Sequence, residues 1–257
     1  MSSILFDIKD AVATITFNRP DKYNAFNREM ALLMHKKLDE CNAKEVRCVL
    51  ITGSGKAFCS GQDLEEVVDP NGPKIDTIVG EHYNPIITRI RQLQKPVVAA
   101  VNGVAAGAGA NIALACDIVI AAQTASFIQA FSKIGLIPDS GGTFFLPRLI
   151  GWQRASALMM LGDKVSADEA ERMGMIYKVF PSESFEEETK KIVATLASMP
   201  TKGLALTKQL LDNSLENNYE DQLHDEEIFQ QRAGSTKDYK EGVQAFLEKR
   251  KPNFTGE

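Results

Sequence analysis

Two segments rich in glycine and alanine are the clearest candidates for chemistry in this sequence. They are AFCSGQDL (residues 57–64) and NGVAAGAGAN (residues 102–111), and each lies between an apolar, strand-like stretch and a helix-like stretch. Amide groups in the first turn of a helix have no partner within it and attract negative charge. Two such turns facing one another would form an oxyanion hole. Each turn alone is also explained by a strand and a helix that pack too closely for any residue but glycine.

A third candidate is Asp139, within GLIPDSGGTFFLPRLIG (residues 135–151). By itself, an aspartate between a proline and Ser-Gly-Gly is typical of a turn or a helix cap. Its combination with the two glycine-rich turns is what makes an acid–base role worth considering.

Several other kinds of site are missing from the sequence. Residues 53–56 (GSGK) lack the spacer and the trailing Ser or Thr of a phosphate-binding loop, and residues 107–109 (GAG) lack the rest of a dinucleotide motif. There is no G-x-S-x-G motif, and the three histidines are scattered. The four cysteines form no C-x-x-C pair, so we expect free, buried thiols in a reducing cytoplasm and no metal site.

Composition narrows the possible partners. With 44% hydrophobic and 25% charged residues, the 257-residue chain has the balance of a globular protein. Its net charge of −5 argues against the broad basic surface that nucleic-acid binding needs. The most apolar segment, residues 97–122, is interrupted by polar residues and is too diluted to span a membrane, and the first residues do not resemble a signal peptide. We therefore expect a cytoplasmic protein with neither nucleic-acid nor membrane partners.

The pattern of elements predicts an α/β fold. Strand-like stretches alternate with helical ones in the first part of the chain, at residues 4–8, 12–17, 46–52, 97–101 and 118–121. From about residue 184 onward only helical patterns remain. We predict a core of residues 1–195 that carries the site, and a helical region of residues 196–257 that packs on neighbouring subunits.

The motifs taken together resemble the crotonase (enoyl-CoA hydratase/isomerase) superfamily. AFCSGQDL is followed by PVVAAVNGVAAGAGANIALACDIVIAA and then by FSKIGLIPDSGGT, and the likeness extends from FNRPDKYNAFN to AGSTKDYKEGVQAFLEKRKPNFTG. The resemblance implies a spiral of repeated ββα units and a C-terminal helical region used for trimerisation, often as a dimer of trimers. It also implies an acyl-CoA substrate and no cofactor apart from the coenzyme A of the thioester itself.

The resemblance also assigns residues. It places the oxyanion hole on the backbone N–H groups of Gln62 and Ala108, and the acid–base group on Asp139. Candidate contacts to CoA are Asn24, Ala25, Phe26, Asp63 and Leu64 and, from a neighbouring subunit, Phe246, Lys249 and Phe254.

Two departures from the family pattern bear on the reaction. Hydratases carry two glutamates that activate water, and here those positions hold Asn111 and Phe131, which we place in the substrate site. Neither side chain is a useful base, so hydration should be crippled. The resemblance then implies isomerisation, with the ring-1,2-epoxide of phenylacetyl-CoA converted to the oxepin, and a shift of a 3-enoyl double bond is a simpler reaction that needs the same groups. Aromatic residues that would wall the acyl pocket, if they are not plain core, are Phe127, Phe131, Phe144 and Phe145.

Three other functions stay open at this point. The chain would also fit a general enoyl-CoA hydratase/isomerase of β-oxidation. In a dehalogenase-like enzyme, Asp139 would attack an aromatic ring. A non-catalytic CoA-binding protein is the third alternative.

Overall fold

Short apolar stretches rich in valine, isoleucine and alanine form the larger of two β-sheets. In the computed structural model, which describes residues 2–257, this sheet has six strands, and all but β1 run parallel to their neighbours. In spatial order they are β1 (Ile4–Lys9), β2 (Val12–Phe17), β3 (Cys48–Gly53), β5 (Val97–Val101), β7 (Ile118–Ala122) and β10 (Lys178–Phe180). Every residue of β5 is buried, as expected of a parallel strand covered on both faces.

A second, smaller sheet is built from short strands that follow the long ones. Its strands are β4 (Ala57–Cys59), β6 (Val104–Ala106), β8 (Ser126–Ile128) and β9 (Lys164–Ser166). The first three are parallel, and β9 is antiparallel to β8. The chain thus repeats a long strand, a short strand and a helix, and each repeat adds its long strand to the same side of the large sheet. This confirms the predicted α/β architecture of wound ββα units.

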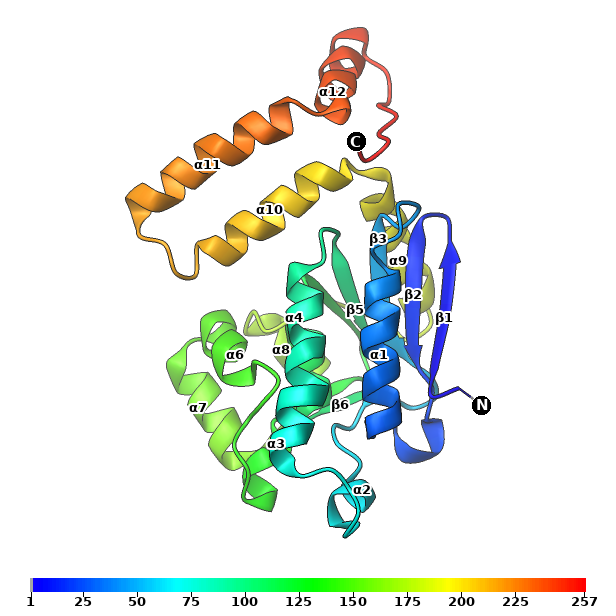
Figure 1. Ribbon diagram of the computed structural model, residues 1–257, viewed down its shortest axis with the longest axis vertical. Helices are drawn as coiled ribbons and strands as arrows, with labels where there is room; N and C mark the ends of the chain where they lie inside the picture. The colour runs from blue at the N-terminus through cyan, green and yellow to red at the C-terminus, as the bar shows by residue number, and fades with distance from the viewer. Residues whose placement is uncertain (1) are drawn as a thin grey trace.

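Helices cover the body on both sides of the sheets (Figure 1). They are α1 (Arg28–Glu40), α2 (Leu64–Val68), α3 (Ile75–Thr77), α4 (Asn84–Gln92), α5 (Ala108–Leu114), α6 (Gly142–Ile150), α7 (Trp152–Leu161), α8 (Ala167–Arg172) and α9 (Phe185–Ser198). Short turns of other helical types are the 3₁₀ turns η1 (Pro20–Lys22) and η3 (Ala130–Ile134) and the π-helical turn η2 (Ile78–Tyr83).

Local chemistry explains why α1 begins and packs where it does. The side chain of Asn27 accepts a hydrogen bond from the Met30 amide (3.0 Å), which satisfies one of the unpaired amides of the first turn. Met30, Met34 and Leu38 recur every four residues and are buried against the body.

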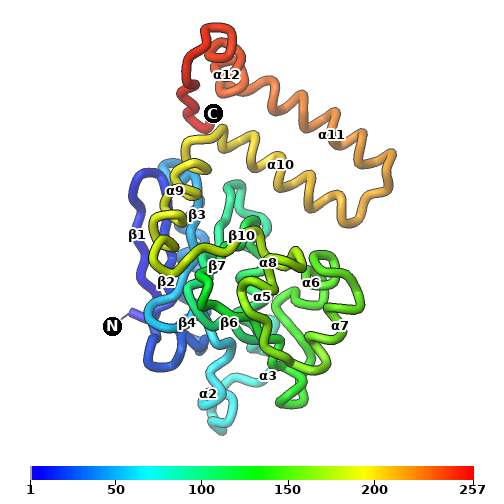
Figure 2. The backbone as a smooth tube through the Cα atoms, turned by 180° about the vertical axis from the view of Figure 1, so that it is seen from behind, coloured from blue at the N-terminus to red at the C-terminus, as the bar shows by residue number. Residues whose placement is uncertain are grey.

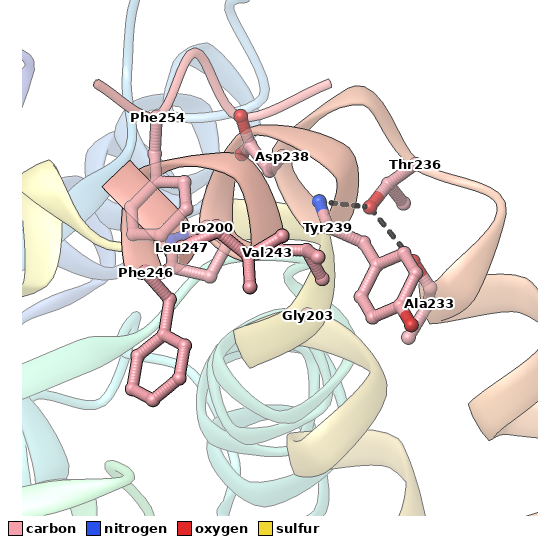
Figure 3. A pocket seen from close by; sticks show the side chains of 11 residues that line it. Pro200, Gly203, Ala233, Thr236, Asp238, Tyr239, Val243, Phe246, Leu247 and Phe254 are labelled. Atoms are coloured by element: carbon pink, nitrogen blue, oxygen red, sulfur yellow. Dashed lines mark hydrogen bonds between the residues drawn. The ribbon is translucent and has the colours of Figure 1, made fainter. Parts of the chain in front are cut away.

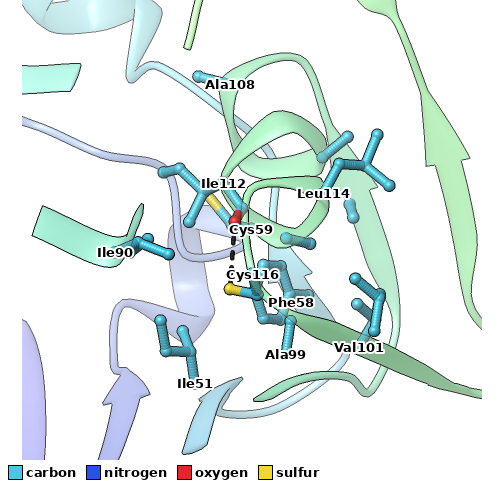
Figure 4. Close-up of a cluster of buried hydrophobic side chains, with 14 of the residues drawn as sticks. Ile51, Phe58, Cys59, Ile90, Ala99, Val101, Ala108, Ile112, Leu114 and Cys116 are labelled. Carbon is cyan, nitrogen blue, oxygen red and sulfur yellow. Dashed lines mark hydrogen bonds between the residues drawn. The ribbon is translucent and has the colours of Figure 1, made fainter. Parts of the chain in front are cut away.

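The main core contains three phenylalanine rings packed edge to face. Phe17 lies 5.1 Å from Phe26 and 5.2 Å from Phe58, measured between ring centroids. Around Phe58, apolar side chains of the strands meet those of α5, as Figure 4 shows for Val101 and Ile112. The four cysteines are free and buried, as predicted, and burial raises the pKa of each thiol to about 12.

Helix α9 covers the opposite face of the large sheet. Val193 and Ala197 lie in a second apolar cluster with side chains of β2, β3, β5 and β7. The predicted boundary between residues 195 and 196 therefore falls inside a helix that belongs to the body, and the chain leaves the body only at Met199–Pro200.

Three helices then form a tail that extends from the body (Figures 1 and 2): α10 (Thr201–Asn213), α11 (Tyr219–Gly234) and α12 (Lys237–Glu248). The buried ammonium of Lys208 in α10 donates to the Ile90 carbonyl (2.7 Å) and pairs with Asp117 (2.9 Å). Arg47 of the body donates to the hydroxyl of Thr201 and to the carbonyl of Phe254. The tail is thus attached to the body by buried and half-buried polar contacts.

Candidate active site

The two glycine-rich turns lie side by side at the ends of neighbouring parallel strands. Strands β4 and β6 pair directly, so the residues that follow each of them emerge at the same edge of the small sheet. A Cβ added to Gly61 would lie 3.0 Å from the Ala106 carbonyl oxygen and 3.5 Å from the Ala108 nitrogen. One added to Gly109 would lie 2.3 Å from the Cys59 carbonyl oxygen. Glycine is therefore needed for close packing, and that packing is also what brings the turns together.

The amides of Gln62 and Ala108 have no acceptor among residues 2–257, and the same holds for the first-turn amides of Leu64, Gly109 and Ala110. Within the first turn of the pair, the Asp63 amide donates to Phe26 and the Gly61 amide contacts the Cys59 sulfur, whereas the Gln62 amide has no partner. In the second turn, the Gly107 amide donates to Ile128, whereas the amide of Ala108, the first residue of α5, is free. The amides of Gln62 and Ala108 are the two that the family resemblance assigns to an oxyanion hole, an assignment that stays a prediction.

The carboxamide of the Gln62 side chain is fixed by two hydrogen bonds, one at its oxygen and one at its nitrogen. Its Oε1 atom accepts a hydrogen bond from the Tyr83 hydroxyl (2.9 Å), and its Nε2 atom donates to Glu66 (2.9 Å). Tyr83 is fully buried at the end of the π-helical turn η2, and its ring packs on Phe26. Tyr83 could not be predicted as a site residue, because nothing in its local sequence indicates that η2 directs the hydroxyl toward Gln62.

Asp139 lies in a strained turn that leads into α6. The next two residues, Ser140 and Gly141, have φ angles of +52° and +73°, and a positive φ is uncommon for serine. This backbone turns the Ser140 hydroxyl toward the carboxylate of Asp139, to which it donates at 2.8 Å. The adjacent Ser140 in the sequence is compatible with such a hydrogen bond to Asp139, but the prediction did not include it.

The environment of Asp139 suits a base. Burial raises the pKa of its carboxyl above the ordinary value, and the hydrogen bond from Ser140 opposes part of that rise. The pKa of Tyr83 is also raised, first by burial and then by the nearby Cys59 and Asp139. Tyr83, which touches Gln62, is therefore within electrostatic reach of Asp139.

Asn111 and Phe131 are the residues that the resemblance places where a hydratase would carry glutamates. The Asn111 side chain is fully buried and donates to the backbone carbonyl of Asp139 (2.8 Å). The Phe131 ring is buried over the second turn, 3.7 Å from where a Cβ of Gly107 would be. Neither position presents a carboxylate to the two turns.

The other predicted pocket phenylalanines have different surroundings. Phe127 is part of the main core. The Phe144 and Phe145 rings contact each other edge to face in α6, and Phe145 packs against Gly141 of the Asp139 turn. Arg148 stacks on Phe144, 3.8 Å from the ring centroid.

The predicted CoA segments of the body are adjacent. Phe26 and Gln62 form a parallel bridge, in which the Phe26 amide donates to Gly61 (2.7 Å). Most side chains of these segments support the backbone. Asn24, at φ +58°, is fully buried and donates to the carbonyls of Ser54 and Ala57.

The remaining members of these segments differ in exposure. Ala25 and Phe26 are buried in the core, whereas Leu64 is half exposed. Asp63 caps α2 and pairs with Arg19 (2.8 Å).

The sequence and the fold of this chain are both similar to those of known enoyl-CoA hydratases and isomerases. The family model described as enoyl-CoA hydratase/isomerase matches residues 7–257. The chain belongs to the enoyl-CoA hydratase/isomerase family. A crystal structure of an enoyl-CoA hydratase from Bacillus anthracis superposes with a TM-score of 0.93 at 34% identity, covering 99% of this chain and all of that one.

Curated relatives carry the names of both an isomerase and a hydratase. The 1,2-epoxyphenylacetyl-CoA isomerase of Escherichia coli (strain K12) is 47% identical over 100% of this chain and 99% of its own length. A probable enoyl-CoA hydratase of Rhodobacter capsulatus is 44% identical over 99% of this chain and 98% of its own length. Full-length similarity to both supports an enzyme of the enoyl-CoA hydratase/isomerase family.

The tail residues predicted to touch CoA lie far from the two turns in this family member. Phe246, Lys249 and Phe254 lie in or after α12, at the opposite end of the subunit from α2 (Figures 1 and 2). The Phe246 and Phe254 rings line an apolar cavity of about 510 Å³ within the tail (Figure 3), and Phe246 is 83% exposed. Within one subunit, the structure does not bring them to the active site.

Two negative findings complete the description of residues 2–257. No helix in that range has the length and apolar character needed to cross a bilayer. The same range contains no group of three or more His, Cys, Asp or Glu side chains placed to hold a metal ion.

Proposed function

We propose that this enzyme isomerises acyl-CoA thioesters by moving a proton from the carbon next to the thioester carbonyl. The observation that carries the proposal is the placement of two free amides, Gln62 and Ala108, side by side, with the backbone of half-buried Asp139 joined to α5 through Asn111. Amides of this kind stabilise an oxyanion, and a half-buried carboxyl with a raised pKa is a suitable base.

Each step of the reaction has a residue to carry it. The C–H bond at C2 breaks, its proton goes to the Asp139 carboxylate, and its electron pair moves onto the thioester oxygen. That developing charge accepts hydrogen bonds from the amides of Gln62 and Ala108, and each donor of an oxyanion hole contributes roughly 3–4 kcal/mol. Asp139 then returns the proton to another carbon, so the product is an isomer. Proton transfer of this type needs no cofactor beyond the CoA of the substrate.

The substrate that we favour is the ring-1,2-epoxide of phenylacetyl-CoA, which would enolise, open and expand to the oxepin. Support comes from the relative named 1,2-epoxyphenylacetyl-CoA isomerase and from the ring of Phe131 over the second turn. A shift of a 3-enoyl double bond to C2 needs the same groups.

A substrate panel tests the proposal. Turnover of the ring-epoxide thioester, a 3-enoyl-CoA and crotonyl-CoA should be measured with the same enzyme preparation. We expect isomerisation of the first two and negligible hydration of the third, because neither Asn111 nor Phe131 can activate water. Rapid hydration of crotonyl-CoA would contradict the proposal and would favour the hydratase alternative, which the Rhodobacter relative's name supports.

We further propose that the enzyme works as a trimer or a dimer of trimers. The tail exposes large apolar side chains in a single subunit: Leu211, Tyr219, Phe246 and Leu247 are 63–83% exposed. These side chains lie at both ends of the tail, near the α10–α11 connection and on α12, and large apolar side chains left exposed in this way indicate surfaces that a partner covers. Light scattering coupled to gel filtration measures the assembly directly, and a stable, active monomer would refute this part.

A further inference from the structure

The turn that carries Asp139 is hydrogen-bonded to a side-chain amide from another element, that of Asn111 in α5. Ser140 and Gly141 both have positive φ angles, and a strained turn of this kind persists only when its surroundings fix it. Its backbone carbonyl at Asp139 accepts two hydrogen bonds, one from the Gly142 amide (2.9 Å) and one from Asn111 Nδ2 (2.8 Å). The first is local to the turn, whereas the second connects it to α5, which also carries the Ala108 amide.

The orientation of the Asn111 amide follows from its partners. A carbonyl oxygen can only accept, so Nδ2 must face Asp139 and Oδ1 must face the other way. There it accepts from Gln129 Nε2 at 2.8 Å. Both amide side chains are buried, and the Gln129 Oε1 atom has no partner among residues 2–257. Gln129 therefore orients Asn111 at the cost of leaving its own oxygen unsatisfied.

We infer that Asn111, oriented by Gln129, is the positioning residue that holds the Asp139 carboxylate in register with the two amides. The inference deepens the proposed function and rests on it. An ionised carboxylate at position 111 could not donate to the Asp139 carbonyl and would repel it. The Asn111 amide also packs directly on the turn, because a Cβ on Gly142 would lie 2.3 Å from its Nδ2 atom. An ionised glutamate here would lose the hydrogen bond to the Asp139 carbonyl, so position 111 serves geometry instead of water activation.

Substitutions at Gln129 separate orientation from packing. Gln129→Ala removes the donor but leaves Asn111 free to keep donating to Asp139. Gln129→Glu keeps the shape, but an ionised glutamate can only accept. It would draw Nδ2 of Asn111 toward itself and turn Oδ1 toward the Asp139 carbonyl. If Asn111 acts by orientation, the isosteric Gln129→Glu change must be the more harmful one.

Four variants test the inference against the wild type on the best substrate of the panel. We expect Asn111→Asp and Gln129→Glu to lower kcat at least tenfold with KM within about twofold, and Gln129→Ala to lower it about threefold. The matched control is Asn42→Asp. Its exposed amide also donates to an aspartate carbonyl, that of Asp39 (3.1 Å), far from the site, and its kcat should not change. Circular dichroism and melting curves establish the folded fraction to which each kcat is normalised.

The outcomes distinguish this inference from the proposed function. If Asp139→Asn is inactive while folded Asn111→Asp and Gln129→Glu keep the wild-type kcat, the proposed function stands and the positioning role falls. A larger loss in Gln129→Ala than in Gln129→Glu would also overturn it, because packing alone would then explain the effect. If Asp139→Asn keeps the wild-type kcat, the proposed function itself fails.

Discussion

The body of this subunit and its C-terminal tail differ in how far their side chains are buried and paired within one chain. In the body, buried polar groups such as Asn111 and Asn24 have protein partners for their donors, and the three-ring cluster around Phe17 is closed to solvent. In the tail, Phe246 and Leu247 are more than 70% exposed. The difference fits the two proposals made above: one chain contains all the groups proposed for catalysis, whereas the exposed apolar side chains of the tail are those that the proposed assembly would cover. Each half can be perturbed separately.

The largest effect should come from the body. Asp139→Asn removes the base without changing its size, and loss of a general base typically lowers the rate by about 10²–10⁴-fold. We expect kcat for isomerisation and deuterium uptake at C2 from heavy water to fall together. KM and the size of the assembly should stay as in the wild type, because the tail is untouched.

Two results would count against this assignment. Unchanged deuterium uptake in Asp139→Asn would show that another group removes the proton. A covalent adduct on Asp139, seen by mass spectrometry of the wild type with substrate, would favour the alternative in which the carboxylate attacks an aromatic ring.

A substitution in the tail should have the opposite result: it should change the assembly and leave the stability of the single subunit nearly unchanged. Phe246→Asp alters a side chain that is 83% exposed in the single subunit, so the subunit's own free energy of unfolding should change by no more than about 0.5 kcal/mol. In an assembly that buries this ring, a charge should cause dissociation, measurable by light scattering. Gln244→Asp, at an exposed polar position of the same helix, is the matched control and should leave the assembly intact. Retention of the wild-type size by Phe246→Asp would place the interface elsewhere.

Much of the body was predictable because its signals are local. Alternating strand and helix patterns gave the α/β architecture, and the glycines at 61 and 109 marked places where backbones approach too closely for a side chain. The resemblance of the motifs assigned the amides of Gln62 and Ala108 and the carboxyl of Asp139 to the site, and these roles stay predictions.

What the sequence did not predict depends on contacts between distant segments. Tyr83 acts on Gln62 through a π-helical turn, and Gln129 acts on Asp139 through Asn111. No spacing rule in a single sequence connects such positions. The predicted boundary at 195/196 fell inside α9 for a related reason: the helical pattern continues through it, and only packing on the sheet assigns α9 to the body.

A smaller effect within the body is expected from Tyr83→Phe. This change removes the hydroxyl that holds Gln62 Oε1 at 2.9 Å and leaves the ring packed on Phe26. A hydrogen bond contributes about 0.5–1.5 kcal/mol, so we expect kcat to fall about two- to tenfold as the Gln62 amide loses its fixed position. Tyr177→Phe, at an exposed site, is the control. An unchanged kcat in Tyr83→Phe would show that the backbone alone positions that amide.

The smallest effect should be a shift in pH dependence at Ser140. The Ser140 hydrogen bond lowers the pKa of Asp139 against the rise caused by burial, so removing the hydroxyl should raise that pKa. Since the carboxylate is the active form, activity is lost as the pH falls through the pKa, and a higher pKa moves this acidic limb to higher pH. A lost bond of about 1 kcal/mol corresponds to roughly 0.5–1 pH unit. Tyr83 does not titrate in this range because its own pKa is raised.

Two substitutions separate the hydroxyl from backbone strain. Ser140→Ala keeps the unfavourable φ of +52°, whereas Ser140→Gly relieves it, and both remove the hydroxyl. The pH–kcat profiles of the two variants should therefore shift equally, with Ser140→Gly melting at the higher temperature. A shift in Ser140→Gly alone would mean that strain in the turn, and not the hydrogen bond, controls the pKa of Asp139, because only that variant relieves the strain.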